Sequence, residues 1–469
     1  MAHVGRVGVG QAVAVCTGAT VVARIGAVVV GFAIIKLLRP EELGLFLGTQ
    51  ALVFAGCGLC DLGLSHGYRM MVSRTHALRE RLLGPTLAVQ AAALLIYFVG
   101  LAAYLGMAGR LTPSVALVAL GALAAQWLAL PNIDLKIFAR FGKSGLLTLL
   151  PMVALAGAAL FCALSDQRFE ALALGYAIGM VTSATVGIRF VGLEAVHLRF
   201  DREYLALVRT SLPFFFSILA YRFSQHWGLS YVLVTQGETA AGVVALPLKL
   251  YQLPLVITIA TTSVTLPMFH RIAQTATSQR FGAVLGRLIR PLWALGGAAA
   301  GVYALCPEVI VDSLASSEYT ASVPLVRVVA VAVLFRVLTV PAENTLESHD
   351  LQWIRLAGQV AGTVMLVVGV ISLLPQYGVI SLTYALLGMD LFFFLWCWGF
   401  SALRLGRALP YGVHLRASCA FAISLGLAFA CGWGGVLRAG YFVACYFALL
   451  TAFRVWTVQD ALDALRARS

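Results

Sequence analysis

The chain has 469 residues and a mass of 50.0 kDa, with 61% hydrophobic and only 11% charged residues and a mean hydropathy of +0.91. About a quarter of the residues of a typical water-soluble domain are charged, and they form much of its surface. This chain has too few charged residues for such a surface, so its composition excludes soluble enzymes, DNA-binding proteins and secreted domains. The formal charge of +13 therefore bears on membrane topology and not on nucleic-acid binding.

Apolar runs of about 18 residues or more predict membrane-spanning helices. The runs are continuous and about twice as long as barrel strands, so the sequence predicts an all-α polytopic membrane protein. The first run is too long for the apolar core of a signal peptide and is interpreted as a span. About 14 spans are expected, at residues 11–35, 43–65, 84–107, 113–133, 145–165, 171–192, 208–234, 240–269, 284–306, 322–343, 354–374, 377–402, 413–431 and 436–455.

Lysine and arginine are distributed unequally between alternate loops. With the N-terminus in the cytoplasm, 23 of the 33 lie in cytoplasmic segments and 5 in the opposite loops. Positive residues are retained on the cytoplasmic side, so the split predicts that both termini are cytoplasmic. The remaining five lie within predicted spans: Arg24, Arg222, Lys249, Arg327 and Arg336.

A weak internal repeat connects the two halves of the chain. Arg24 precedes Gly44 by 20 residues, Arg222 precedes Gly242 by the same 20, and the two pairs are offset by 198. Repeated halves are typical of transporters. The sequence therefore predicts two six-helix lobes related by a pseudo-two-fold repeat, at residues 1–200 and 201–405, followed by two additional helices and a cytoplasmic tail at 406–469.

The same region carries a family resemblance over about forty residues. Residues 37–46 read Leu-Leu-Arg-Pro-Glu-Glu-Leu-Gly-Leu-Phe, and residues 61–64, Asp-Leu-Gly-Leu, precede a basic loop that ends near Arg74. This pattern resembles the N-terminal signature of the Wzx-type O-antigen and repeat-unit flippases, which are polysaccharide transporters of the MOP exporter superfamily. The two additional C-terminal helices depart from the commonest twelve-helix members.

The resemblance implies a MATE-like fold with a central cavity and alternating access. It implies flipping of undecaprenyl-pyrophosphate-linked oligosaccharides from the cytoplasmic to the periplasmic leaflet of the bacterial inner membrane, for O-antigen, capsule or exopolysaccharide assembly. It also implies coupling to an H⁺ or Na⁺ gradient, no cofactor, and a polysaccharide polymerase and a chain-length regulator as partners.

Charged residues at membrane depth are costly and usually line a cavity or meet a partner. An arginine fork binds phosphate oxygens well, so Arg24 and Arg222 are the first candidates for the pyrophosphate; the alternative is that each pairs with an acid or with carbonyls. Arg222, Gln225 and His226 share one helix face. The predicted cationic cavity comprises Arg24, Arg222, Gln225, His226, Lys249 and Arg336.

Three acids are candidates for ion coupling: Asp61, Glu343 and Asp390. Asp390 lies in the most apolar surroundings, whereas Asp61 could cap a helix end and Glu343 follows Pro341 near a span boundary. The histidines His66 and His226 are further titratable candidates.

No catalytic or metal-binding pattern is present in the sequence. It contains no Walker A motif, no H-E-x-x-H and no G-x-S-x-G, and its nine cysteines lack zinc or disulfide spacing. Three other functions stay open. A lipid II flippase with fourteen helices shares the same cavity physics. A multidrug exporter would favour an acidic cavity, and a membrane-embedded polymerase or ligase would need a longer outer loop than residues 306–321.

Overall fold

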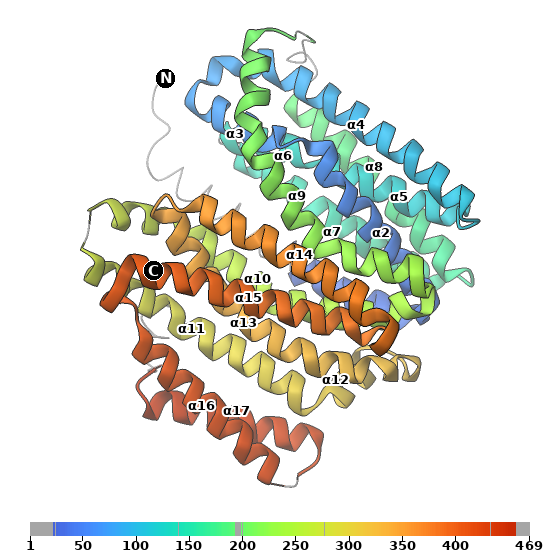
Figure 1. Cartoon of the computed structure of the whole chain (residues 1–469). Coiled ribbons are helices and arrows are strands. Elements are labelled where there is room, and N and C mark those ends of the chain that lie inside the picture. Colours follow the sequence, from blue (N-terminus) through green and yellow to red (C-terminus); the bar gives the residue numbers. More distant parts are fainter. Residues whose placement is uncertain are drawn as a thin grey trace. The chain divides into compact units, whose positions relative to one another are not determined.

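The computed structural model describes residues 22–23, 25–138, 140–192, 198, 200–275, 277–431 and 433–455. All regular elements in these ranges are helices (Figure 1). Twelve of them are long and apolar enough to cross a membrane. The protein is therefore a multi-pass α-helical membrane protein, as its composition predicts.

Contacts within the chain divide it into two compact units, residues 1–245 and 246–469. The first contains α2 (Pro40–Asp61), α3 (Leu64–Arg74), α4 (Arg79–Met107), α5 (Pro113–Trp127), α6 (Ala129–Ile137), α7 (Phe141–Leu164), α8 (Arg168–Val191), α9 (Arg202–Gln236) and the start of α10 (Glu238–Thr275). The second contains the rest of α10, then α11 (Ser278–Leu305), α12 (Pro307–Leu314), α13 (Val323–Ser348), α14 (Gln352–Tyr377), α15 (Ile380–Leu405), α16 (Tyr411–Ala430) and α17 (Gly435–Ala452).

The helices agree closely with the spans expected from hydropathy. Twelve expected spans correspond to the twelve apolar helices, and the expected span 208–234 corresponds to α9, which is bent by 48° between Leu212 and Phe214. The first expected span, 11–35, lies largely outside the described residues. Its described part belongs to a helix at Ile25–Leu37.

The second span is broken into α2 and α3 by two residues in the left-handed region. Leu62 has φ 49° and Gly63 has φ 71°, and glycine adopts this conformation without steric cost. A Cβ on Gly63 would also overlap the carbonyl oxygen of Ser211 on α9. Gly63 therefore permits both the break and the close contact of this span with α9.

The internal repeat forms a reciprocal crossing between α2 and the start of α10. A Cβ on Gly44 would overlap the carbonyl oxygen of Glu238, and a Cβ on Gly242 would overlap that of Pro40. Glu238 follows Pro40 by the same 198 residues that separate Gly242 from Gly44. The two contacts are thus exchanged by a pseudo-two-fold operation, as in an isologous interface. The two glycines of the predicted repeat therefore meet in one symmetric contact.

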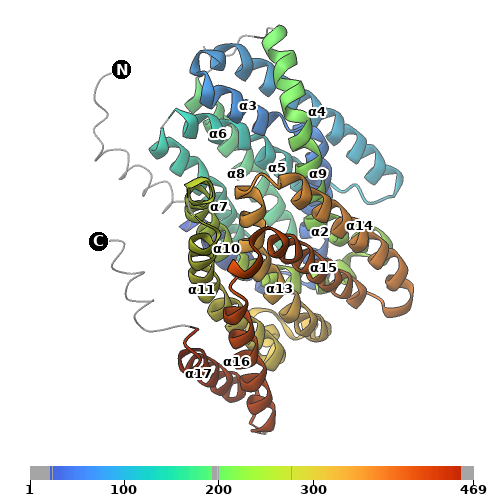
Figure 2. The ribbon, with the colours of Figure 1, turned by 60° about the vertical axis from the view of Figure 1, so that its left-hand side comes forward.

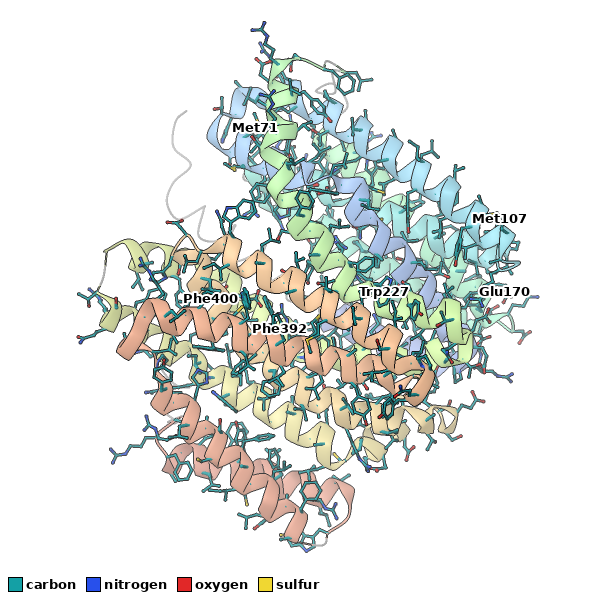
Figure 3. The ribbon with its side chains drawn as sticks, in the orientation of Figure 1. Met71, Met107, Glu170, Trp227, Phe392 and Phe400 are labelled. Carbon is teal, nitrogen blue, oxygen red and sulfur yellow. The ribbon has the colours of Figure 1, made fainter. Side chains whose placement is uncertain are left out.

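In the second unit, aromatic residues of α15 pack against α14. Phe392, Trp396 and Phe400 form a row along α15, with ring centroids 5.7 and 4.9 Å apart; Figure 3 labels the first and last of them. The indole of Trp396 donates a hydrogen bond to the carbonyl of Ile354 (2.9 Å). A Cβ on Gly358 would overlap the Trp396 ring, so the small residue lets the two helices approach closely.

The C-terminal pair α16–α17 packs on α11 (Figure 2). Phe442 and Tyr446 of α17 are buried where Gly301 and Gly297 leave space on α11. The hydroxyl of Tyr446 donates to the carbonyl of Trp293 (2.8 Å), and the indole of Trp293 donates to His414 Nδ1 of α16 (3.1 Å). The two additional helices therefore share the core of the second unit.

Candidate functional site

The break between α2 and α3 carries a cluster of polar side chains. Ser65 donates a hydrogen bond to Asp61 Oδ1 (2.5 Å), and Gln90 of α4 donates to Asp61 Oδ1 (2.7 Å) and to Ser65 Oγ (3.0 Å). Asp61 is half-buried at the end of α2. Asp61, a predicted coupling acid, therefore accepts hydrogen bonds from neutral donors. The bond from Gln90 connects α4 to the broken span.

Arg222 of α9 lies directly beside α2. Its Cβ is 3.4 Å from the position that a Cβ on Gly58 would occupy, and it acts electrostatically on Cys57 and His66. The side chain is half-buried and forms no ion pair or side-chain hydrogen bond to any described residue. Asp61 acts on the same two residues but forms no ion pair with Arg222. An arginine at membrane depth that forms no ion pair with the described residues is available for an anionic ligand.

The polar face of α9 continues beyond Arg222. Gln225 and His226 follow at one turn and are half-buried, and the His226 ring lies 5.2 Å from that of Phe54 on α2. Trp227, labelled in Figure 3, stacks on Tyr231 with centroids 4.9 Å apart. The structure thus brings Arg222, Gln225 and His226 onto one part of the first unit. Arg24 lies outside the described residues.

A second polar cluster lies in the second unit around Asp390. Asp390 of α15 is 1% exposed, and the hydroxyl of Tyr251 on α10 donates to its Oδ2 (2.8 Å). The other oxygen, Oδ1, is buried and has no hydrogen-bond partner in the part of the chain that the structure describes. Such an orphaned oxygen is costly when the group is charged.

Arg336 and Glu343, two further predicted site residues, form an ion pair on α13. Arg336 donates to Glu343 Oε1 (2.7 Å), and the other oxygen of Glu343 lies 3.5 Å from Arg355 of α14. Arg355 also approaches Glu347 at 3.9 Å. The guanidinium of Arg336, predicted for the substrate cavity, lies 5.6 Å above the ring of Phe393.

Lys249 of α10 belongs to the second unit and is half-buried. Its ammonium group has no hydrogen bond or ion pair to the described residues. Like Arg222, it is a cation without a protein partner at membrane depth.

Several polar partners were not expected from the sequence. Arg79 at the start of α4 binds both carboxylate oxygens of Asp134 on α6 (3.0 and 2.9 Å), and Tyr68 donates to the same carboxylate (2.5 Å). A second hydrogen bond from Arg79 reaches the carbonyl of Val191 (2.8 Å). Asp134 directly follows the apolar run 113–133, and an acid at the end of a span was the only sign in the sequence of a buried ion pair. The hydrogen-bonded pairs are separated by 55 to 112 residues along the chain, so no local spacing indicates them.

The described residues contain no group of three or more His, Cys, Asp or Glu side chains suited to a metal ion. The eight cysteines in the described ranges are all free thiols. The polar groups of these sites are guanidinium, ammonium, imidazole, carboxyl, amide and hydroxyl groups.

No known family profile matches the sequence, and no curated protein matches it either. Solved structures do. The lipid II flippase MurJ in an inward closed conformation matches with a TM-score of 0.74 and 12% identity over 93% of this chain and 98% of that one. An inward-facing multidrug resistance transporter of the MATE family matches with a TM-score of 0.65 and 14% identity, over 83% and 95%.

A third similar structure is a MOP superfamily transporter from Pyrococcus furiosus, with a TM-score of 0.59 and 12% identity over 85% of this chain and 96% of that one. At these identities the likeness concerns the fold. The chain has the fold that these MOP superfamily structures share.

Proposed function

We propose that this chain flips undecaprenyl-pyrophosphate-linked oligosaccharide repeat units from the cytoplasmic to the periplasmic leaflet of the bacterial inner membrane. The products would serve O-antigen, capsule or exopolysaccharide assembly, with a polysaccharide polymerase and a chain-length regulator as partners. The observation that carries the proposal is Arg222, an arginine at membrane depth that has no anionic partner among the described residues. Its side chain needs an anion, and a pyrophosphate supplies one.

The repeat provides a second arginine for the same ligand. Arg24 precedes Arg222 by 198 residues, the offset that relates Gly44 to Gly242 at the pseudo-symmetric crossing. Two arginines at equivalent positions of two repeats could bind the two phosphates of one pyrophosphate. Gln225 and His226 add neutral donors and acceptors on the same face for sugar hydroxyls.

Alternating access requires a contact that opens on one side of the membrane. The crossing of α2 and α10 is the candidate, because its contacts are backbone against glycine and one hydrogen bond, from Thr239 to Glu41 (2.9 Å). With both termini cytoplasmic, this crossing lies on the periplasmic side. Its separation would release the head group outward, driven by an H⁺ or Na⁺ gradient.

One observation favours a second candidate, the export of lipid II. MurJ is a lipid II flippase, and it matches this chain over almost its full length. Lipid II also carries a polyprenyl pyrophosphate, so the same arginines would bind it. A multidrug exporter fits less well, because unpaired Arg222 and Lys249 would repel cationic drugs.

The test is complementation in a host that lacks its repeat-unit flippase. We expect the wild type to restore surface polysaccharide, and Arg222→Ala and Arg24→Ala to reduce it roughly ten- to a hundredfold, as for loss of hydrogen bonds to a charged group. Arg209→Ala is the matched control, since Arg209 is an exposed arginine on the same helix. All variants are compared at equal membrane abundance.

Two results would contradict the proposal. If the wild type restores no surface polymer with several repeat units but rescues a host lacking its lipid II flippase, the substrate is lipid II. If the wild type works and the Arg222 and Arg24 variants equal Arg209→Ala, the cationic site does not bind the pyrophosphate.

A further inference from the structure

A buried carboxyl group with an unsatisfied oxygen lies inside the second unit. Asp390 is 1% exposed, Tyr251 of α10 satisfies its Oδ2, and its buried Oδ1 has no hydrogen-bond partner within the described ranges. An ionised carboxylate in such surroundings is strongly unfavourable unless a cation compensates it. Asp390 must therefore hold a proton or receive a cation.

Arg336 of α13 is the cation whose charge acts on Asp390. Its guanidinium lies over Phe393, which follows Asp390 by three residues on the same face of α15. Arg336 and Glu343 are the charged side chains that act on Asp390 electrostatically. Arg336 donates to Glu343 at 2.7 Å, so Glu343 and an ionised Asp390 would compete for the same guanidinium.

Among the charged side chains of this cluster that the structure describes, the charges balance only when Asp390 carries a proton. Two guanidinium groups, Arg336 and Arg355, stand against the three carboxyl groups of Glu343, Glu347 and Asp390. With Asp390 protonated the sum is zero, and with Asp390 ionised two carboxylates compete for Arg336. A metal cation at Asp390 would be repelled by the nearby guanidinium. A proton instead forms a covalent bond to the carboxylate oxygen and neutralises it.

We infer that Asp390 is a proton-binding site and that Arg336 exchanges between Glu343 and Asp390 as the proton binds and leaves. The proton comes from water and adds to Oδ1 of Asp390. On release it returns to water, and Arg336 turns to the ionised carboxylate. Glu343 is then paired with Arg355 of α14 only. This changes the ion pairing between α13 and α14.

This inference deepens the proposed function, because it names the ion that drives transport, but its test does not use transport. The full-length protein is purified into lipid nanodiscs, and infrared spectra are recorded over a pH titration. A protonated carboxylic acid has a carbonyl band that a carboxylate lacks. We expect one such band in the wild type that disappears at alkaline pH, that is missing in Asp390→Asn and that shifts in frequency in Asp390→Glu.

The Glu343→Gln variant gives the sharper comparison, because it leaves Asp390 intact. Removing the competing carboxylate frees Arg336 for Asp390 and balances the cluster without a proton, so the band should be lost at neutral pH. The matched control is Glu308→Gln, since Glu308 pairs with Arg327 in an exposed ion pair, and it should keep the wild-type band. Melting temperatures confirm that each variant is folded.

The inference is overturned if Asp390→Asn keeps the band, or if Glu343→Gln and Glu308→Gln both titrate like the wild type. Neither result bears on the lipid-linked substrate. Conversely, failure of complementation would leave the infrared comparison unaffected. The two proposals therefore fail separately.

Discussion

At the scale of single residues, charge in this protein is held in small networks that join helices. The best satisfied is the one in which Asp134 binds Arg79 and Tyr68, with Asp134 1% exposed and the Arg79 side chain 16% exposed. It joins α3, α4 and α6, and Arg79 extends it to the end of α8. Removing one partner of a buried pair leaves an uncompensated charge.

Asp134→Ala is therefore expected to lower the free energy of unfolding by about 3–5 kcal/mol. Arg81→Ala, which removes an exposed ion pair between α4 and Glu203 of α9, should cost about 0–1 kcal/mol. Thermal unfolding of the purified protein in detergent measures both changes. Equal melting temperatures for the two variants would show that the Arg79–Asp134 pair contributes no net stability.

The sequence predicted which residues would be charged at membrane depth, but not their partners. Arg336 was expected in a substrate cavity and Glu343 and Asp390 among coupling acids, yet α13 and α15 place all three in one cluster. Tyr251 precedes Asp390 by 139 residues, and no local spacing indicates such a contact. Hydropathy gives the depth of a residue, whereas tertiary packing decides what it meets.

At the scale of helices, the glycines of the repeat determine how closely α2 and α10 cross. Gly44 and Gly242 each face a carbonyl oxygen of the other helix with no space for a Cβ. Hydropathy predicted both helices, and the equal spacing predicted that they are equivalent. That the equivalent residues meet each other could not be predicted, because spacing along the chain carries no information on which faces are opposed.

Gly44→Leu should force the crossing apart and reduce flipping at least about tenfold, since overpacking typically costs 1–3 kcal/mol. Gly100→Leu on α4 is the matched control, because nothing lies within 4 Å of a Cβ there. A cysteine at buried Thr49 should react faster with a water-soluble maleimide in the Gly44→Leu protein. Unchanged labelling and transport would mean that this crossing does not close the pathway.

At the scale of the whole molecule, composition and hydropathy were sufficient for the membrane class and for the twelve apolar spans that the described residues contain. The additional helices α16 and α17 were expected as a separate C-terminal segment; the structure packs them onto α11 through Phe442 and Tyr446. Glycines at 297 and 301 on α11 make that contact possible, but glycine is frequent throughout this chain, with 45 residues, so its positions alone did not indicate a partner.

Phe442→Ala should therefore destabilise the second unit by about 3–5 kcal/mol, as expected for a fully buried aromatic residue. Leu437→Ala on the same helix, where the side chain is 69% exposed, should be nearly neutral in detergent or lipid. The comparison is again made by thermal unfolding. A small effect of Phe442→Ala would show that α17 is only loosely attached to α11.

The central claim is that this chain moves a lipid-linked oligosaccharide across the membrane. The most direct measurement reconstitutes the purified protein into vesicles containing a fluorescent polyprenyl-pyrophosphate oligosaccharide and follows its transfer between leaflets by quenching with an impermeant reagent. The account predicts transfer by the wild type and by Arg209→Ala, with a loss of roughly ten- to a hundredfold in Arg222→Ala. Transfer no faster than in protein-free vesicles, together with rapid transfer of lipid II, would contradict it.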